Sequence, residues 1–456
     1  MTINAAFQWQ CHPKAEALAM RLLDGCVRGN EFIANLAEDL HKHTSTRLFD
    51  WVDHLVAGHS PELEKELEKT GYVFQHAAPA YRVFYHPGAQ LPRIVLRDQD
   101  QPVVGVAVSV ESIANFLMVR GLCCLVEGTP LSGYRRALLA TDNGISLWVV
   151  ERRGTLTLEP TYPEPIALKN YLEAIEKWKG RPRDLSDEEG AMHHTLILAE
   201  ELVELLGQDL AAWVVLEVER DYWQARNTAG LIQKGRQDRL GMGWANHDHH
   251  TFRSSRRHFS ALVRLFEILG FYCRERFYAG EEAGWGAQVM ENPRAKLVLF
   301  LDVDLAPHEL ELDFAHQGLP ELDNLGTIGL WCELQGDSIL KAGMHHLEAQ
   351  FMFEELTHDL NALRVRMMDP FSNFPYLKQA FTEGEVWHVD PRRIDKLLRN
   401  GKITQEQAEK FRAYGAVGSH MENLQRREGY KGFNQKNVSF IIKKTDPRII
   451  PTALGA

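Results

Sequence analysis

The chain has 456 residues, of which 45% are hydrophobic and 25% charged, so disordered, collagen-like and low-complexity classes are excluded and about two to three domains are expected. A net charge of −11 and the lack of a dense Lys/Arg stripe argue against a nucleic-acid-binding protein. No apolar run approaches the roughly 20 residues that span a bilayer. The N-terminus shows no secretory signal pattern, and the six cysteines include no C-x-x-C pair. We therefore expect a soluble cytoplasmic protein with free, mostly buried thiols and no membrane partner.

The first 163 residues predict a mixed α+β domain. Apolar residues at helical spacing predict helices between positions 15 and about 70, including one through Leu48, Trp51 and Leu55, and another that begins at Ser60-Pro61. Short β-branched or alternating runs then predict strands at 81–85, 93–96, 103–110 and 145–150. Three prolines at 160, 163 and 165 favour a domain boundary there.

Residues 164–243 predict a helical connecting region. The stretch 219–239 is expected to be a polar helix whose Arg and Lys side chains mostly form a solvated face. No internal repeat is evident in this region.

The region 244–456 predicts a domain built from two similar segments. In each, a short strand that contains His leads into an amphipathic helix, and further strands follow. The strands begin at 248–253 and 346–350, and the helices at 258–269 and 353–363 follow them. Later elements are a helix opened by the capping box at Thr404 and strands near 417–425 and 438–442. Two βαβββ units in tandem predict a pair of half-barrels around a shared site.

Strand alternation places polar residues of three strands on single faces. His249 shares a face with Arg253, and His346 shares one with Glu348 and Gln350, which makes His345 the weaker candidate. In the third strand Glu422 lies on the polar face. Two imidazoles and one carboxylate form a facial triad that suits Fe(II) and leaves coordination positions open.

Other interpretations of these residues stay open. A single His more often makes a structural hydrogen bond than binds a metal. Glu422 can pair with a neighbouring arginine, at 426 or 427, and Glu348 is a competing carboxylate. His247 and His250 are competing imidazoles.

Two motifs carry a resemblance to known metalloenzymes. Asp248-His249-x-x-x-Arg253, followed by a helix that ends in Leu-Gly-Phe, resembles the opening strand of vicinal-oxygen-chelate (VOC) metalloenzymes. It is most similar to the 2-oxoadipate dioxygenase/decarboxylase (hydroxyglutarate synthase) group. Glu422-x-x-Gln425-Arg426, with Gly432-Phe433 and Asn437 after it, is similar to the ending of 4-hydroxyphenylpyruvate dioxygenases. The resemblance covers roughly residues 246–445 and none of the first 240.

The resemblance implies His249, His346 and Glu422 as metal ligands and Fe(II) as cofactor, with Mn, Zn or Ni as other divalent candidates. It further implies a non-haem dioxygenase that oxidatively decarboxylates a 2-oxo acid, with the small carboxylate and O2 as partners. Arg253 would bind the substrate carboxylate by a two-point contact, and Gln350 and Gln425 would orient polar atoms.

Two alternatives are an isomerase, lyase or hydrolase that uses a divalent metal without oxygen, and a non-enzymatic binding protein with a structural His cluster. In the first of these, Glu348 or Glu422 would act as base. The sequence leaves the oligomeric state open.

Overall fold

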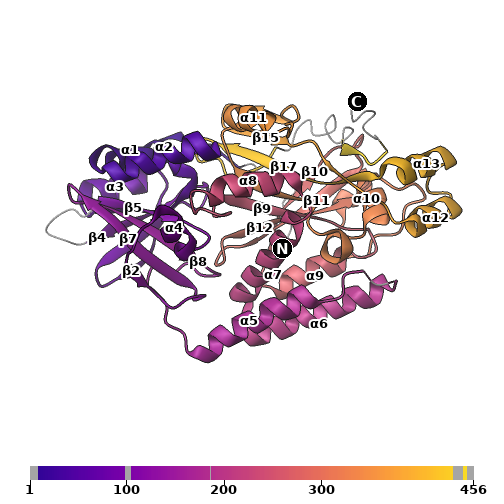
Figure 1. Ribbon diagram of the computed structural model, residues 1–456, viewed down its shortest axis with the longest axis horizontal. Coiled ribbons are helices and arrows are strands. Elements are labelled where there is room, and N and C mark those ends of the chain that lie inside the picture. Colours follow the sequence, from indigo (N-terminus) through magenta and orange to yellow (C-terminus); the bar gives the residue numbers. More distant parts are fainter. Residues whose placement is uncertain (1–8, 98–103, 185, 435–444, 449–456) are drawn as a thin grey trace.

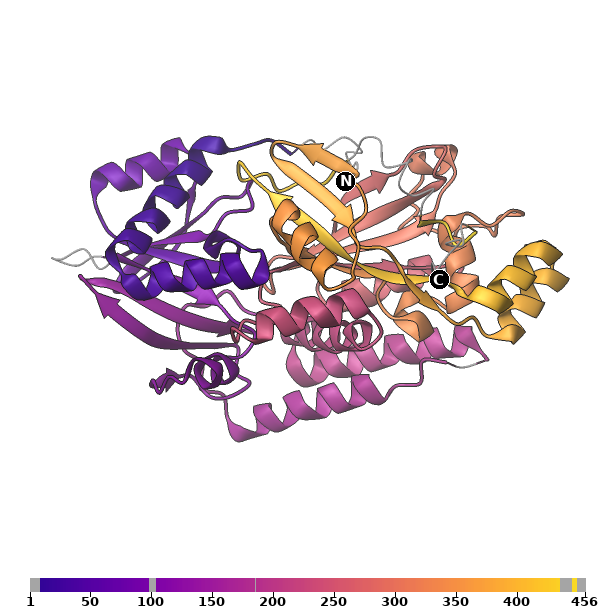
Figure 2. The same cartoon turned by 45° about the horizontal axis from the view of Figure 1, so that its top comes forward.

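The computed structural model describes residues 9–97, 104–184, 186–434 and 445–448. Two large mixed β-sheets form the framework, one in the N-terminal part and one in the C-terminal part of the chain. In Figure 1 the N-terminal sheet lies at the left, in indigo and purple, and the helices α5 and α6 run along the bottom beneath the C-terminal part. The second view keeps this arrangement (Figure 2).

The N-terminal sheet is covered on one face by α1 (Pro13–Gly29) and α2 (Glu31–Thr44). The predicted helix through Leu55 is wrong: Leu48–Trp51 forms one 3-10 turn, and β1 (Val52–Gly58) follows it. β1 lies between β4 and β5 and its interior residues are buried, so both of its faces favour apolar side chains. A central strand of this kind has no alternating pattern, and its apolar run resembles that of a helix. The helix predicted from Ser60-Pro61 is confirmed as α3 (Pro61–Lys69), with Ser60 as its N-cap.

The eight strands of this sheet form two modules of the same βαβββ plan. The first module is β1, α3, β2 (Val73–Ala78), β3 (Tyr81–Tyr85) and β4 (Arg93–Arg97). The second is β5 (Val104–Ser109), α4 (Ile113–Arg120), β6 (Val126–Glu127), β7 (Tyr134–Asp142) and β8 (Ile145–Arg152). The sheet order is β2-β3-β4-β1-β5-β8-β7-β6; the first and last strands of each module are parallel, and β1 and β5 join the modules antiparallel. The predicted mixed α+β domain is thus itself a tandem pair.

Four helices connect the two sheets: α5 (Pro165–Gly180), α6 (Glu188–Leu206), α7 (Gln208–Gln224) and α8 (Thr228–Asp238). The helix predicted over 219–239 is interrupted at Asn227, whose side chain caps α8. Its charged residues are not all solvated, because Glu219, Arg220 and Arg236 are buried. Glu219 accepts hydrogen bonds from Arg181 and Arg183, which lie between α5 and α6, and these contacts take the place of hydration.

The C-terminal sheet repeats the plan of the N-terminal one. Its first module is β9 (His247–Arg253), α9 (Phe259–Ile268), β10 (Tyr272–Tyr278), β11 (Trp285–Asn292) and β12 (Leu297–Asp304). Its second module is β13 (His346–Gln350), α11 (Phe353–Ala362), β14 (Ser372–Phe374), β15 (Leu377–Phe381) and β17 (Ala416–Arg426). The order β10-β11-β12-β9-β13-β17-β15-β14 matches the N-terminal sheet strand for strand. The predicted fold class, an α+β chain with tandem βαβββ half-barrels at its C-terminus, is confirmed.

Additional elements decorate the last module. α10 (Thr327–Gln335) precedes it, and β16 (Glu385–Trp387), α12 (Pro391–Arg399) and α13 (Gln405–Tyr414) are inserted before β17. The predicted capping box at Thr404 opens α13. The strand predicted at 438–442 and Asn437 lie outside the described residues.

The expectations about membrane-spanning helices and about the cysteines can be compared with the structure. Within the described ranges, no helix combines the length and the hydropathy that a bilayer crossing requires. All six cysteines are free, as predicted, but only Cys26 and Cys332 are buried, so the expectation of mostly buried thiols is wrong.

Candidate metal centre

Three neighbouring strands bring four potential ligands into one buried cluster. In strand register, His249 of β9 pairs with Glu348 of β13, which pairs with Glu422 of β17. His346 stands two residues before Glu348 on the same face. One ligand atom from each of the four residues lies within 4.8 Å of the others. The Nε2 atom of His346 is 2.9 Å from Oε2 of Glu422, and His249 Nε2 contacts Glu348 Oε2.

Burial gives this cluster the electrostatics of a cation site. Desolvation raises the pKa of Glu422 to about 7 and the pKa of Glu348 well above its usual range, and the charge of Glu422 raises the pKa of Glu348 further. Desolvation also lowers the pKa of His249 and His346, so both imidazoles are neutral. Neutral imidazoles and two crowded, buried carboxyl groups are a donor set that fits a divalent cation.

Asp248 orients the first imidazole. Its Oδ1 atom lies 3.0 Å from His249 Nδ1, and Arg426 donates to both of its oxygens at 3.1 and 3.2 Å. A carboxylate on Nδ1 places the proton there and directs the lone pair of Nε2 into the cluster. The pairing of Glu422 with Arg426, which the sequence left open, does not occur, since Arg426 is bound to Asp248.

Gln379 of β15 is a member of the site that the sequence did not reveal. Its Nε2 atom donates to Oε1 of Glu348 at 3.2 Å and to Oε1 of Glu422 at 3.1 Å. One amide thus holds both carboxylates. The only signal in the sequence is a glutamine in a short apolar strand.

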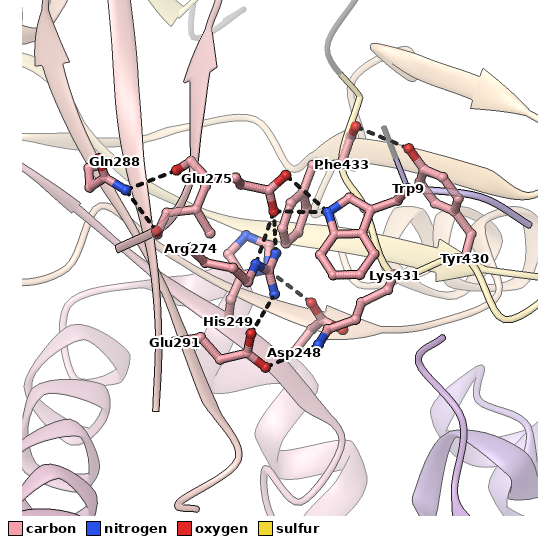
Figure 3. A network of polar contacts seen from close by, with 12 residues as sticks. Trp9, Asp248, His249, Arg274, Glu275, Gln288, Glu291, Tyr430, Lys431 and Phe433 are labelled. Atoms are coloured by element: carbon pink, nitrogen blue, oxygen red, sulfur yellow. Dashed lines mark hydrogen bonds and ion pairs between the residues drawn. The ribbon is translucent and has the colours of Figure 1, made fainter. Parts of the chain in front are cut away.

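Aromatic side chains enclose the cluster. The ring centroid of Phe433 lies 4.8 Å from that of His249 and that of Phe300 lies 4.9 Å from it, and the two phenylalanine rings pack edge to face at 4.5 Å. Figure 3 shows Phe433, His249 and Asp248 together, with the ion pairs of Arg274 and Glu275 beside them. Phe381 packs against His346 at 5.2 Å. These rings exclude water from the side chains that would carry the chemistry.

Arg253 lies buried near the cluster with few partners. Only 4% of it is exposed, its Nε atom is 4.0 Å from Asp302, and its guanidinium lies 5.4 Å from the Trp331 ring centroid. Within the described ranges, Nε and Nη1 have no hydrogen-bond acceptor. Its charge contributes to the lowered pKa of His346, which places the guanidinium within electrostatic reach of the cluster. A buried, underused guanidinium is a suitable partner for a substrate carboxylate.

The two predicted glutamines lie in different places. Gln350 donates to Asp248 Oδ2 at 3.3 Å and so supports the residue that orients His249. The structure does not bring Gln425 to the cluster. Its Oε1 atom accepts a hydrogen bond from the backbone N–H of Phe353 at 2.9 Å, which anchors the start of α11.

The competing imidazoles also separate. His247 Nδ1 is bound to the carbonyl of Trp244, and His250 lies beside Arg220. His345 and His420 lie next to His346, and the three form a second group of donors that overlaps the first only at His346.

The N-terminal sheet has a counterpart of this cluster with different residues. Matching strand order and register places His54 where His249 stands, because His54 pairs with Ala107 as His249 pairs with Glu348. Ala107 in turn pairs with Trp148, at the position of Glu422. Gly105 takes the position of His346, and a Cβ atom on it would lie 2.5 Å from the Trp148 ring. The indole therefore fills the space where the C-terminal sheet gathers its donors.

The ion pair between Asp248 and Arg426 has a counterpart in the N-terminal sheet. The register shift in β1 falls at Asp53, and that in β9 falls at Asp248. Asp53 accepts two hydrogen bonds from Arg152 at 3.0 and 2.8 Å, and Arg152 occupies the register position of Arg426. His54 Nδ1 is 2.7 Å from Asp53, as His249 Nδ1 is close to Asp248. The Asp-His-Arg arrangement is therefore repeated, whereas three of the four cluster positions are not.

No protein-family model matches this sequence, and no curated protein matches it. Several solved structures are similar at low identity. A 4-hydroxymandelate synthase variant from Streptomyces coelicolor is 10% identical over 87% of this chain and 98% of its own, with a TM-score of 0.30. A putative hydrolase from Shewanella frigidimarina is 13% identical over 54% of this chain and 97% of its own (TM-score 0.30). Methylmalonyl-CoA epimerase from Mycobacterium tuberculosis is 10% identical over 40% and 89% (TM-score 0.23). The fold described above rests on strand order and register, not on these matches.

Proposed function

We propose that this protein is a metalloenzyme of the VOC type that holds one Fe(II) ion through His249, His346 and Glu422 and oxidatively decarboxylates a 2-oxo acid. The observation that carries the proposal is the convergence of these side chains, from three strands, in one buried cluster. Two imidazoles and one carboxylate are the donor set of non-haem Fe(II) oxygenases.

The residues of the chain have distinct tasks in this reaction. Bound Fe(II) would supply open positions for chelation of the 2-oxo acid and for O2. Arg253 binds the substrate carboxylate, because its buried guanidinium has unsatisfied donors. Asp248 keeps the Nδ1 proton of His249 in place, and Gln379 donates to both carboxylates and fixes their positions. The rings of Phe300 and Phe433 exclude water.

Glu348 favours a second candidate function. It lies within the cluster, and desolvation raises its pKa well above the usual range, which favours the protonated carboxyl group. A carboxyl group of this kind can exchange protons with a substrate carbon, as an isomerase or lyase needs, while a divalent metal acts only as a Lewis acid.

Oxygen uptake separates the two candidates. Protein reconstituted anaerobically with Fe(II) is mixed with a panel of 2-oxo acids in an oxygen electrode, and released CO2 is measured in parallel. We expect uptake and CO2 release in equal amounts from at least one substrate, and none with His346→Ala. Exchange of substrate protons with D2O, without oxygen uptake, would instead support the second candidate. Folded protein that binds no divalent metal would contradict both.

A further inference from the structure

A cavity lies between the N-terminal and C-terminal sheets. Its volume is about 490 Å³, and its lining comes from both sheets and from the helical region between them. Asp248 and Gln350 contribute to the wall, whereas none of the four residues of the metal cluster does. The cavity therefore adjoins the outer support of the candidate metal centre and is separate from the centre itself.

Most carboxylates of the wall are already neutralised from outside it. Four of the five are paired with a cation that does not line the cavity. The pairs are Asp50 with Arg47, Asp248 with Arg426, Glu111 with Lys234 and Glu291 with Arg274. Asp53 is paired with cations of the wall itself, and Lys431 of the wall also contacts Glu291 at 3.2 Å. The wall has five Lys and Arg side chains and five carboxylates, and Arg47 and Arg426 add positive charge behind it.

Two of these cations are buried with unused donors. Arg93 is 5% exposed, its Nη2 atom is 3.6 Å from Asp53, and neither Nε nor Nη2 has a hydrogen-bond acceptor within the described ranges. Arg220 is 3% exposed, its nearest carboxylate oxygen is 3.8 Å away on Glu111, and its Nε atom is likewise unsatisfied there. Both side chains line the cavity. Buried donors without acceptors are costly unless a bound group supplies the acceptors.

Lys296 reaches the cavity from a strained turn. It lies between β11 and β12 and has a φ of +56°. Residues other than glycine rarely adopt this left-handed backbone conformation. Its Nζ atom is 3.3 Å from Asp53 Oδ1, across the boundary between the two sheets, and its side chain is 42% exposed. Desolvation, with the nearby charge of Arg93, lowers the pKa of Lys296 to about 8. Strain of this kind persists where the surrounding structure imposes it, and it is frequent at binding sites.

We infer that this cavity binds a small organic anion, with a carboxylate or phosphate group held by Arg93, Arg220 and Lys296. Charge-assisted hydrogen bonds from these donors would satisfy what the protein leaves unpaired. The indole rings of Trp213 and Trp244 also line the cavity and provide apolar surface for the body of the ligand. The volume is within the usual range of about 300–1,000 Å³ for small-molecule sites. This site does not depend on the proposed function of the metal cluster.

Binding of succinate and of inorganic phosphate to the full-length, metal-loaded protein tests the inference. Titration calorimetry at constant ionic strength is combined with tryptophan fluorescence, and succinamide serves as the uncharged control. We expect at least one anion to bind and succinamide not to bind. Succinate alone would identify a carboxylate site, phosphate alone a phosphate site, and both a general anion site.

Variants locate the binding. Lys296→Ala should weaken it at least about tenfold, because a charge-assisted contact is lost. Arg294→Ala, on the same turn with a side chain that is 80% exposed, is the matched control and should not change it. Arg93→Met and Arg220→Met should also weaken it; should either fail to fold by circular dichroism, Lys296→Ala still decides. Absence of binding by both anions, or equal affinity in Lys296→Ala and wild type, would overturn the inference. Weakening by Arg253→Met and not by Lys296→Ala would place the anion at the metal cluster and overturn it as well.

Discussion

The two sheets of this protein share a plan and differ in what fills it. Both consist of paired βαβββ modules with the same strand order, and both have a register shift at an Asp that precedes a His and binds a late Arg. In the C-terminal sheet the space beyond this Asp-His pair contains imidazoles and carboxylates. In the N-terminal sheet the same space contains Gly105, Ala107 and the ring of Trp148.

This difference separates the requirements of the fold from those of the site. The Asp-Arg ion pair joins the first strand of one module to the last strand of the other in both sheets, so it serves the architecture. The imidazole and carboxylate donors occur together only in the C-terminal sheet, where they converge in one cluster. His54 shows the distinction most clearly: it has the Asp partner of a metal ligand, but its neighbours across the sheet are alanine and an indole.

The largest expected effect comes from breaking the shared ion pair. Arg426→Met leaves Asp248 without a cation in a buried position and should lower the free energy of unfolding by about 3–5 kcal/mol. Arg152→Met should lower the free energy of unfolding by less, because Asp53 still has Lys296 as a partner at 3.3 Å. Urea unfolding of the metal-free variants measures both. A negligible loss of unfolding free energy in both variants would show that the ion pair stabilises neither sheet.

The substrate contact should show a smaller effect that is confined to activity. Arg253→Met should lower kcat/KM for the substrate by roughly 2–4 kcal/mol, a factor of about 30 to 900, because the carboxylate loses its buried partner. Arg253→Lys should recover only part of the loss, since an ammonium cannot make the planar two-point contact. Metal content should be unchanged in both. Wild-type kinetics in Arg253→Met would remove the anion-binding role.

The smallest effect concerns the orienting carboxylate. Asp248→Asn should weaken divalent-metal affinity by about 10- to 100-fold, because the amide supports His249 Nδ1 less well than a carboxylate. Asp53→Asn, at the matching position of the other sheet, should leave the affinity unchanged. Competition with a chromogenic chelator measures both. Parallel losses in the two variants would mean that the effect is one of overall stability.

The C-terminal modules could be predicted from the sequence because their signals are local. A strand with alternating polar residues leads into an amphipathic helix in each module, and the alternation placed His249, His346 and Glu422 on faces that the structure brings together. Their role as ligands stays a prediction. The N-terminal duplication could not be found in this way, since β1 is buried on both faces and its apolar spacing through Leu55 favoured a helix.

The remaining parts of the site depend on register, which the sequence does not specify. Gln379 reaches both carboxylates only because β15 pairs with β17 in one particular register. The same holds for Arg426, which the sequence offered as a partner for Glu422 and which binds Asp248 instead. Gln425 follows the predicted alternation to the other face, where it caps the backbone of α11 rather than serving the cluster.

Metal content of anaerobically purified protein tests the central claim most directly. Elemental analysis should find about one divalent ion per chain in the wild type and in His54→Ala. The ion should be lost in His249→Ala, His346→Ala and Glu422→Ala while circular dichroism shows a folded protein. Loss of the ion in His54→Ala with retention in His249→Ala, or a folded wild type that takes up no divalent metal, would contradict the account.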